Sequence, residues 1–214
     1  MFVHSQLVYV SLAHRYWNTL WTVAENRKVY GTSASCEGLG SNLKVVLGRK
    51  SVEAKELDFE ESLRRLKALA DHRCLFTEFT EFGSVASTLE RITLWLAREL
   101  NSPESEDWAY LEVHETDQLA CRLESGLDRL EIVQKVGNLT LAVRGSVDES
   151  SGLVLPRDLL PQAVEEVFPL FEARFSSESE WANQLFAELR RRVPQLTSLS
   201  IDLGRQKSWR VSDS

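Results

Sequence analysis

Leu111-Glu112-Val113-His114-Glu115 recurs in the second half of the chain as Leu199-Ser200-Ile201-Asp202-Leu203. In both stretches apolar side chains alternate with others, which is the pattern of a strand that buries one face. Each stretch is followed at the same distance by an arginine in a second short run, at Arg122 and at Arg210. The sequence therefore predicts one pair of strands that is present twice.

The duplication extends to the elements that precede these strands. Two earlier strands are predicted at 2–14 and 42–48, separated by a long loop, and their counterparts at 130–136 and 138–143. Apolar residues then recur every three to four positions, as in helices with one buried face. These helices are predicted from Asp58, at 87–100 behind a capping box, at 157–175 and at 178–192. Closing strands are predicted at 108–115, 120–123, 197–203 and 208–211.

We therefore expect an α+β protein made of two tandem modules, each with the order strand, strand, helix, helix, strand, strand. The modules are predicted at 1–125 and 126–214, with a short polar bridge, Glu124-Ser125-Gly126, at the boundary. A single larger α+β domain with coincidental symmetry is the alternative. In each module an antiparallel four-stranded sheet carries both helices on one face, so the other face and two edges are uncovered. Closure of several modules into an oligomeric β-barrel is the expected solution.

Composition narrows the range of partners and compartments. The chain has 214 residues and a formal net charge of -7, which disfavours nucleic acid and acidic membrane surfaces as partners. No stretch resembles an export signal or is apolar enough to span a bilayer. The three cysteines, Cys36, Cys74 and Cys121, form no CxxC pair, as expected in a reducing compartment. We expect a cytoplasmic protein.

Several short motifs of the first half occur in the order that a known enzyme family shows. They are Leu12-Ala13-His14-Arg15, Asn26-Arg27-Lys28-Val29-Tyr30-Gly31, Gly38-Leu39-Gly40-Ser41-Asn42, Leu57-Asp58-Phe59, Asp71-His72-Arg73, Ser87-Thr88-Leu89-Glu90 and His114-Glu115-Thr116-Asp117. With this series the chain resembles the 6-pyruvoyltetrahydropterin and 6-carboxytetrahydropterin synthases, a tunnelling-fold family, over about residues 7–126. The second half resembles only the shared architecture.

The resemblance implies a pocket that binds a pterin or purine-like heterocycle edge-on through a buried carboxylate. Glu115 stands at the position of that anchor, and a carboxylate suits the role because it can accept two parallel N–H groups. Thr88 and Thr116 match further substrate-binding positions of the family. At the place of Glu115 the second half has Leu203, which cannot anchor a pterin, so we expect one anchor per chain.

The family's zinc site is incomplete in this sequence. The enzymes bind zinc through three histidines, and only His14 is retained, because Leu39 and Ser41 stand at the other two positions. One imidazole does not make a catalytic zinc site, which needs three protein ligands. We therefore expect no cofactor and no stable zinc. Rescue of the site by Cys36 and Cys74 is an alternative with no supporting ligand spacing.

The acid and base groups are retained in part. Asp71 and His72 match the family's aspartate-histidine pair, in which a carboxylate orients an imidazole for proton transfer. The alternative is a pair that ends a helix and complements its dipole. Ser33 stands where the eukaryotic enzymes have a cysteine, and a small shift of the loop would let Cys36 serve instead. These four residues are the candidate catalytic groups.

Three functions follow from these features. The first is a zinc-independent enzyme that acts on a dihydroneopterin-type side chain by aldolase, epimerase or lyase chemistry. The second is a non-catalytic pterin or purine binder, or a structural paralogue of a synthase. The third is the family's zinc-dependent synthase reaction. In each case we expect a homo-oligomer, with two chains closing a ring of four modules or three chains forming two stacked rings of three.

Overall fold

The computed structural model describes residues 2–51, 59–100, 108–127, 129–171, 178–202 and 208–212. The elements of the first half are β1 (Phe2–His14), α1 (Val23–Tyr30), η1 (Gly31–Ser33), β2 (Leu39–Ser51), α2 (Glu60–Ala70), β3 (Arg73–Cys74), α3 (Leu75–Glu78), η2 (Thr80–Phe82), α4 (Leu89–Leu100), β4 (Trp108–Thr116) and β5 (Leu119–Glu124). Those of the second half are β6 (Leu130–Val136), β7 (Leu139–Gly145), α5 (Leu159–Val167), η3 (Phe168–Phe171), α6 (Glu178–Arg192), β8 (Leu196–Asp202) and β9 (Ser208–Ser212). The η elements are 3-10 helices.

All nine described strands belong to one sheet, in the order β3-β1-β2-β4-β5-β6-β7-β8-β9. Neighbouring strands are antiparallel except for the short parallel pair of β1 and β3. The predicted pairing of the first two strands is confirmed, with Val8 opposite Val45. β5 pairs with β6 through Cys121 and Ile132, so the strands of the two halves form one continuous sheet. The predicted α+β class is confirmed.

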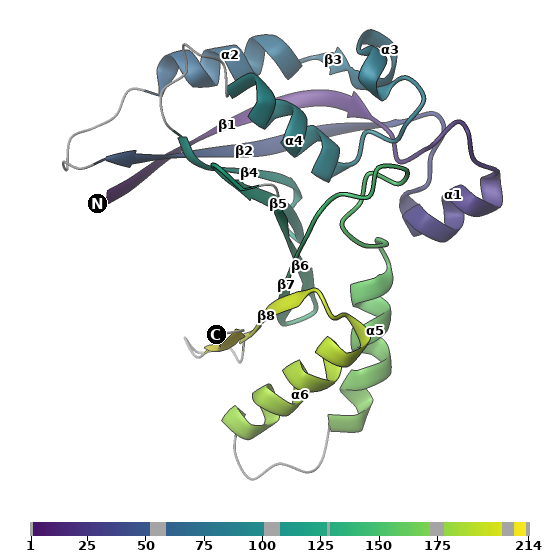
Figure 1. The fold of residues 1–214 in the computed structure, drawn as a ribbon, viewed down its shortest axis with the longest axis vertical. Helices are drawn as coiled ribbons and strands as arrows, with labels where there is room; N and C mark the ends of the chain where they lie inside the picture. Colours follow the sequence, from purple (N-terminus) through teal and green to yellow (C-terminus); the bar gives the residue numbers. More distant parts are fainter. Residues whose placement is uncertain are drawn as a thin grey trace.

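The strands bury one face, as their alternation predicts. In β1 the side chains of Val8, Val10 and Leu12 are buried, whereas Leu7 and Tyr9 between them are 50% and 60% exposed. Helices α2 and α4 pack on β1, β4 and β5, and helices α5 and α6 pack on β6, β8 and β9 (Figure 1).

In the described part of the chain, the larger of two clusters of buried hydrophobic side chains contains residues of both halves. The cluster includes Leu111 of β4 and its counterpart Leu199 of β8, together with Leu123 and Leu130 on either side of the β5–β6 turn. The expected boundary between 125 and 126 therefore lies in the β5–β6 turn, and the strands on both sides of this turn contribute to the same core. Division of the chain into two modules stays a prediction.

Two segments differ from the sequence-based expectation. The loop expected between the first two strands contains α1, whose N-cap Thr22 and Glu25 form a capping box. The helix expected over 157–175 has α-helical geometry only at Leu159–Val167 and continues as η3. Pro169 explains this end, because proline has no N–H for the next helical hydrogen bond. Residues 172–175 of that prediction lie outside the described ranges, as do Leu203 and the Leu57-Asp58 part of the expected helix start.

Within the described ranges, no helix combines the length and the apolar character that crossing a membrane requires.

We expect the fold to depend on Trp95 of α4, which is 3% exposed and contacts the rings of Phe79 and Phe82 edge-on at centroid distances of 5.0 and 5.7 Å. Trp95→Ala should lower the free energy of unfolding by about 3–5 kcal/mol, because truncation leaves a cavity. Urea unfolding measures the change. Leu20→Ala, at a side chain 80% exposed, is the control and should change the value by less than about 0.5 kcal/mol. Equal effects of the two substitutions would contradict the core packing.

Candidate functional site

Glu115 lies near the end of β4, where the register with β5 shifts between His114 and Thr116. Its side chain is only 13% exposed. The Tyr16 hydroxyl donates a hydrogen bond of 2.7 Å to its Oε2 atom. The predicted anchor is therefore a largely buried carboxylate that neighbouring side chains hold in place.

His14, the last residue of β1, connects Glu115 to the start of α4. Its Nδ1 lies 3.1 Å from the carbonyl oxygen of Ser87, and because a carbonyl only accepts, Nδ1 carries the proton. In the neutral ring Nε2 then accepts a hydrogen bond of 2.9 Å from the Ser41 hydroxyl. The same Nε2 lies 3.3 Å from Oε1 of Glu115. The structure thus brings together the one retained zinc-ligand position and the anchor carboxylate.

Arg157 brings a positive charge to this group from the segment between β7 and α5. One of its nitrogens, Nη2, donates to the Tyr16 hydroxyl and to Oε2 of Glu90, the latter at 3.2 Å. The same nitrogen lies 3.9 Å from Oε2 of Glu115, and the guanidinium lies over the Tyr16 ring at 4.7 Å from the centroid. The side chains of Arg157 and Glu90 are 9% and 2% exposed. One buried cation therefore faces two carboxylates.

Burial and these charges shift the pKa values of the group. Burial lowers the pKa of His14, although Glu115 and the hydrogen bond with Ser87 act in the opposite direction. Burial raises the pKa of Glu90 against the opposing effect of Arg157, and it holds the pKa of Tyr16 well above its usual value. Burial alone would lower the pKa of Arg157, but Glu90, Tyr16 and Glu115 together raise it. At neutral pH His14 is thus uncharged, Tyr16 is a hydroxyl donor and Arg157 is a cation.

Residues 148–158, which we call the 148–158 segment, pack against the first half through their main chain. Three side chains of the first half donate to its carbonyl oxygens: Asn18 to Ser150 at 3.0 Å, Tyr30 to Ser151 at 2.8 Å and Thr88 to Gly152 at 2.5 Å. Arg91 donates in the same way to Glu149. These bonds hold the 148–158 segment, and with it Arg157, beside the start of α4.

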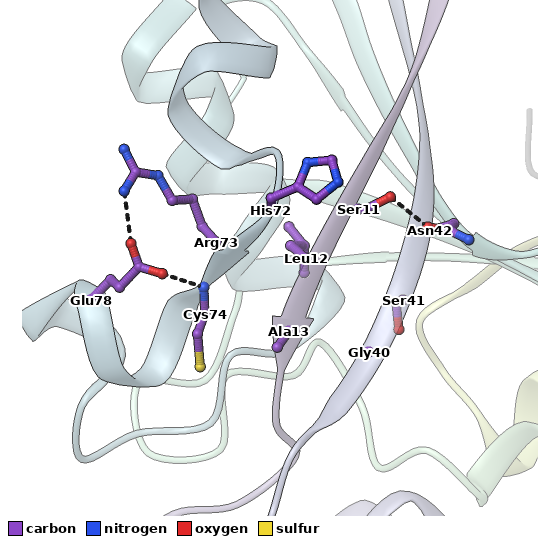
Figure 2. Close-up of a pocket in the computed structure, with 10 residues that line it drawn as sticks. All are labelled: Ser11, Leu12, Ala13, Gly40, Ser41, Asn42, His72, Arg73, Cys74 and Glu78. Atoms are coloured by element: carbon purple, nitrogen blue, oxygen red, sulfur yellow. Dashed lines mark hydrogen bonds and ion pairs between the residues drawn. The ribbon is translucent and has the colours of Figure 1, made fainter.

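His72 lines a different place, an open cavity of about 410 Å³ between β3, the end of β1 and the start of β2 (Figure 2). Asp71 accepts a hydrogen bond from the Ser11 N–H at 2.8 Å, and its Oδ2 lies 3.3 Å from Nδ1 of His72. His72 is 83% exposed and has a φ of 59°. This left-handed conformation follows the C-cap of α2, where helices commonly adopt it. The aspartate-histidine pair is thus present, with its imidazole open to solvent.

Within the part of the chain that the structure describes, none of the other predicted site residues forms a hydrogen bond with Glu115. The Thr88 hydroxyl is used by Gly152, and Thr116 is exposed, with its hydroxyl accepting from the N–H of Gln118 in the β4–β5 turn. Ser33 ends η1 and Cys36 is exposed in the loop after it. Among the described residues, no hydrogen bond connects either of them to His72 or Glu115. A catalytic role for Ser33 or Cys36 stays a prediction.

The donor atoms around His14 do not fit the family's zinc ion. Ser41 offers a neutral hydroxyl where the family has an imidazole, and Leu39 points no donor at all toward a metal. Within the described ranges, no three His, Cys, Asp or Glu side chains gather in a way that could hold a metal ion. Nε2 of His14 is engaged by the Ser41 hydroxyl instead.

Sequence reasoning missed the side chains that complete the group around Glu115, namely Tyr16, Ser41 as a partner of His14, Glu90 and Arg157. Tyr16 could have been found, since it continues the inward alternation of β1 two residues beyond His14. Arg157 carries no such signal, because it lies 42 residues beyond Glu115 in the numbering and precedes a helix of the second half.

We expect removal of Arg157 to destabilise the protein strongly. Arg157→Met leaves Glu90 and Glu115 without their cation and should lower the free energy of unfolding by about 3–5 kcal/mol. Arg144 is the matched control, because it also lies 3.2 Å from a glutamate, Glu131, but is 44% exposed. Arg144→Met should cost less than about 1 kcal/mol. Similar losses in urea unfolding would show that the buried pair has no special role.

Stability should also fall as the pH decreases from 7 toward 5. The unfolded chain takes up a proton at His14 near pH 6.5, whereas the folded protein does so only at lower pH, so acid favours the unfolded state. The contribution approaches about 1.4 kcal/mol per pH unit below 6.5. Glu90 has the opposite sign, since its raised pKa favours the folded state in acid. His14→Asn, which keeps a donor for Ser87, should show a smaller loss, and identical pH profiles in urea unfolding would contradict this role.

Comparison with known proteins places the fold but not the family. No family model matches the chain, and no curated protein matches it. Among solved structures, an uncharacterized protein from Wolinella succinogenes is 16% identical and covers 58% of this chain and 98% of its own, with a TM-score of 0.43. The 6-pyruvoyl tetrahydropterin synthase of Caenorhabditis elegans is 19% identical and covers 58% of this chain and 96% of its own, with a TM-score of 0.52. Over somewhat more than half of its length, the chain therefore has a fold similar to that of this synthase.

Proposed function

We propose that the chain is a pterin-class protein that holds the amino-pyrimidinone edge of a pterin or purine-like heterocycle at Glu115, without zinc. The observation that carries the proposal is the state of the Glu115 carboxylate. It is 13% exposed and is held by Tyr16 and faced by the cation of Arg157. The similarity of the fold to a pterin synthase supports the choice of ligand class.

The carboxylate of Glu115 keeps capacity for a ligand. Two carboxylate oxygens offer about four acceptor positions. The hydrogen bond from Tyr16 uses one of them at Oε2, whereas the proton of His14 is on the nitrogen that faces Ser87. Arg157 stays 3.9 Å away, beyond hydrogen-bond distance. Two parallel N–H groups of a heterocycle can therefore still bind, each charge-assisted bond contributing about 1.5–3 kcal/mol.

We assign the catalytic part of the proposal to Asp71 and His72. His72, whose Nδ1 lies 3.3 Å from Oδ2 of Asp71, lines the open cavity, and Ser41 lines the same cavity while its hydroxyl binds His14. Ser41 thus links the cavity to the residue beside Glu115. Proton transfer by His72 suits zinc-independent aldolase, epimerase or lyase chemistry on a dihydroneopterin-type side chain, with Ser33 or Cys36 as the second group.

The second candidate is a non-catalytic structural relative of a synthase. One observation favours it: the 148–158 segment fills the space beside Thr88 and brings Arg157 to the anchor from within the same chain. In this reading the carboxylate stabilises the fold and binds no ligand. Ligand binding distinguishes the two candidates.

Titration of the purified protein with pterin, 7,8-dihydroneopterin and guanine tests the proposal. Micromolar binding should be seen by calorimetry, and Glu115→Gln should weaken it about ten- to hundredfold because the amide offers one acceptor oxygen instead of two. Glu112→Gln, at a half-buried glutamate of the same strand, is the control. His72→Ala should abolish turnover of the dihydropterin and leave its binding intact.

Two results would contradict the proposal. Absence of binding to all three compounds favours the structural relative. Stoichiometric zinc in the protein as purified, lost in His14→Ala, would instead support the zinc-dependent reaction.

We also infer that the repeated order of elements reflects two tandem modules and that the protein forms a homo-oligomeric barrel. The uncovered face of β1 supports this, because Val3, Leu7 and Tyr9 are 53%, 50% and 60% exposed along one line of the strand. Light scattering should give two or three chains per particle. Tyr9→Lys should shift the distribution toward single chains, and a monomeric wild-type protein would contradict the inference.

A further inference from the structure

Arg157 has an N–H group that no other side chain uses. Its Nη2 serves Tyr16 and Glu90, but its Nε is buried and has no hydrogen-bond partner in the described structure. Arg15 and Arg122 also have such an Nε. They differ from Arg157 because both are partly exposed, whereas the Arg157 side chain is 9% exposed.

A buried donor without a partner costs free energy and is rare in proteins. The unpaired N–H of Arg157 is therefore suited to bind an acceptor atom of a ligand. Glu115 has the complementary property, because its carboxylate oxygens can accept further hydrogen bonds. Nη2 of Arg157 lies 3.9 Å from Oε2 of Glu115, and the unused Nε belongs to the same planar guanidinium, so the unused donor is held on the group that faces the carboxylate. A ligand that fits both presents N–H groups beside a carbonyl oxygen.

We propose that Arg157 recognises the carbonyl oxygen of the heterocycle whose N–H groups bind Glu115, so that the site selects a cyclic amide edge. Guanine and pterin share this edge: an exocyclic amino group, a ring N–H and an adjacent carbonyl. The amino group and the ring N–H donate to Glu115, and Nε of Arg157 donates to the carbonyl. The second half of the chain thereby supplies a specificity residue to a site whose anchor belongs to the first half. The inference rests on the proposed function.

The test compares guanine with 6-thioguanine, which keeps both N–H donors and replaces the carbonyl oxygen by sulfur, a weak acceptor. Wild-type protein should bind guanine about ten- to hundredfold more tightly, the effect of one charge-assisted hydrogen bond. Arg157→Lys keeps the charge but has no Nε–H, and should bring the ratio of the two dissociation constants close to one. Glu115→Gln should weaken both compounds and leave the ratio unchanged.

Each outcome bears on one of the two claims. Equal binding of guanine and 6-thioguanine by the wild type would overturn the role of Arg157 while the proposed function stands. A ratio that persists in Arg157→Lys would also overturn it, because the larger sulfur atom would then explain the preference. Binding of neither compound, nor of pterin, would overturn the proposed function itself. If Arg157→Lys fails to fold, Arg157→Gln replaces it, because its neutral amide also has no Nε–H, and the same ratio close to one is expected.

Discussion

The charge of Arg157 is the constraint on which the candidate site depends. Glu90 and Glu115 approach each other from α4 and β4 beneath the helices, where two unpaired carboxylates would be unfavourable by several kcal/mol. Within the described residues, no arginine or lysine of the first half forms an ion pair with either carboxylate. The chain instead brings Arg157 from its second half, on a segment held by main-chain contacts. The halves therefore share an electrostatic centre as well as a hydrophobic core.

His14 is held by hydrogen bonds at both ring nitrogens and lies beside Glu115. The hydrogen bond to the Ser87 carbonyl fixes the tautomer of the imidazole. Its unprotonated nitrogen, Nε2, faces the Ser41 hydroxyl and Glu115. A serine hydroxyl both donates and accepts, so it satisfies the imidazole without a cation. The positive charge beside this group is carried by Arg157, whose Nη2 lies 3.9 Å from Oε2 of Glu115.

Much of the fold could be predicted from the sequence, because alternation in the strands and the three-to-four-residue spacing of the helices depend on local residues. The strand at 108–115 and the helix that ends at Leu100 were placed within one or two residues. Glu115 and His14 could each be singled out through the family resemblance. Arg157, the partner of Glu115 from the second half, could not be found in this way. Its contact with Tyr16 depends on how the sheet bends and on the path of a loop. Neither property has a periodic signal.

The 148–158 segment has a consequence for how this protein can change in evolution. Its contacts with Asn18, Tyr30 and Thr88 use carbonyl oxygens, which every amino acid provides. Exposed positions of the segment such as Glu149 can therefore change while its path is kept, whereas the side chains of Leu153, Leu155 and Arg157 are buried. Gly152 is an exception, because its φ of 74° suits glycine and a Cβ there would meet the Arg91 side chain. The hydrogen bonds that hold the 148–158 segment to the first half are thus formed mainly by its main chain, and comparison of sequences does not detect such contacts.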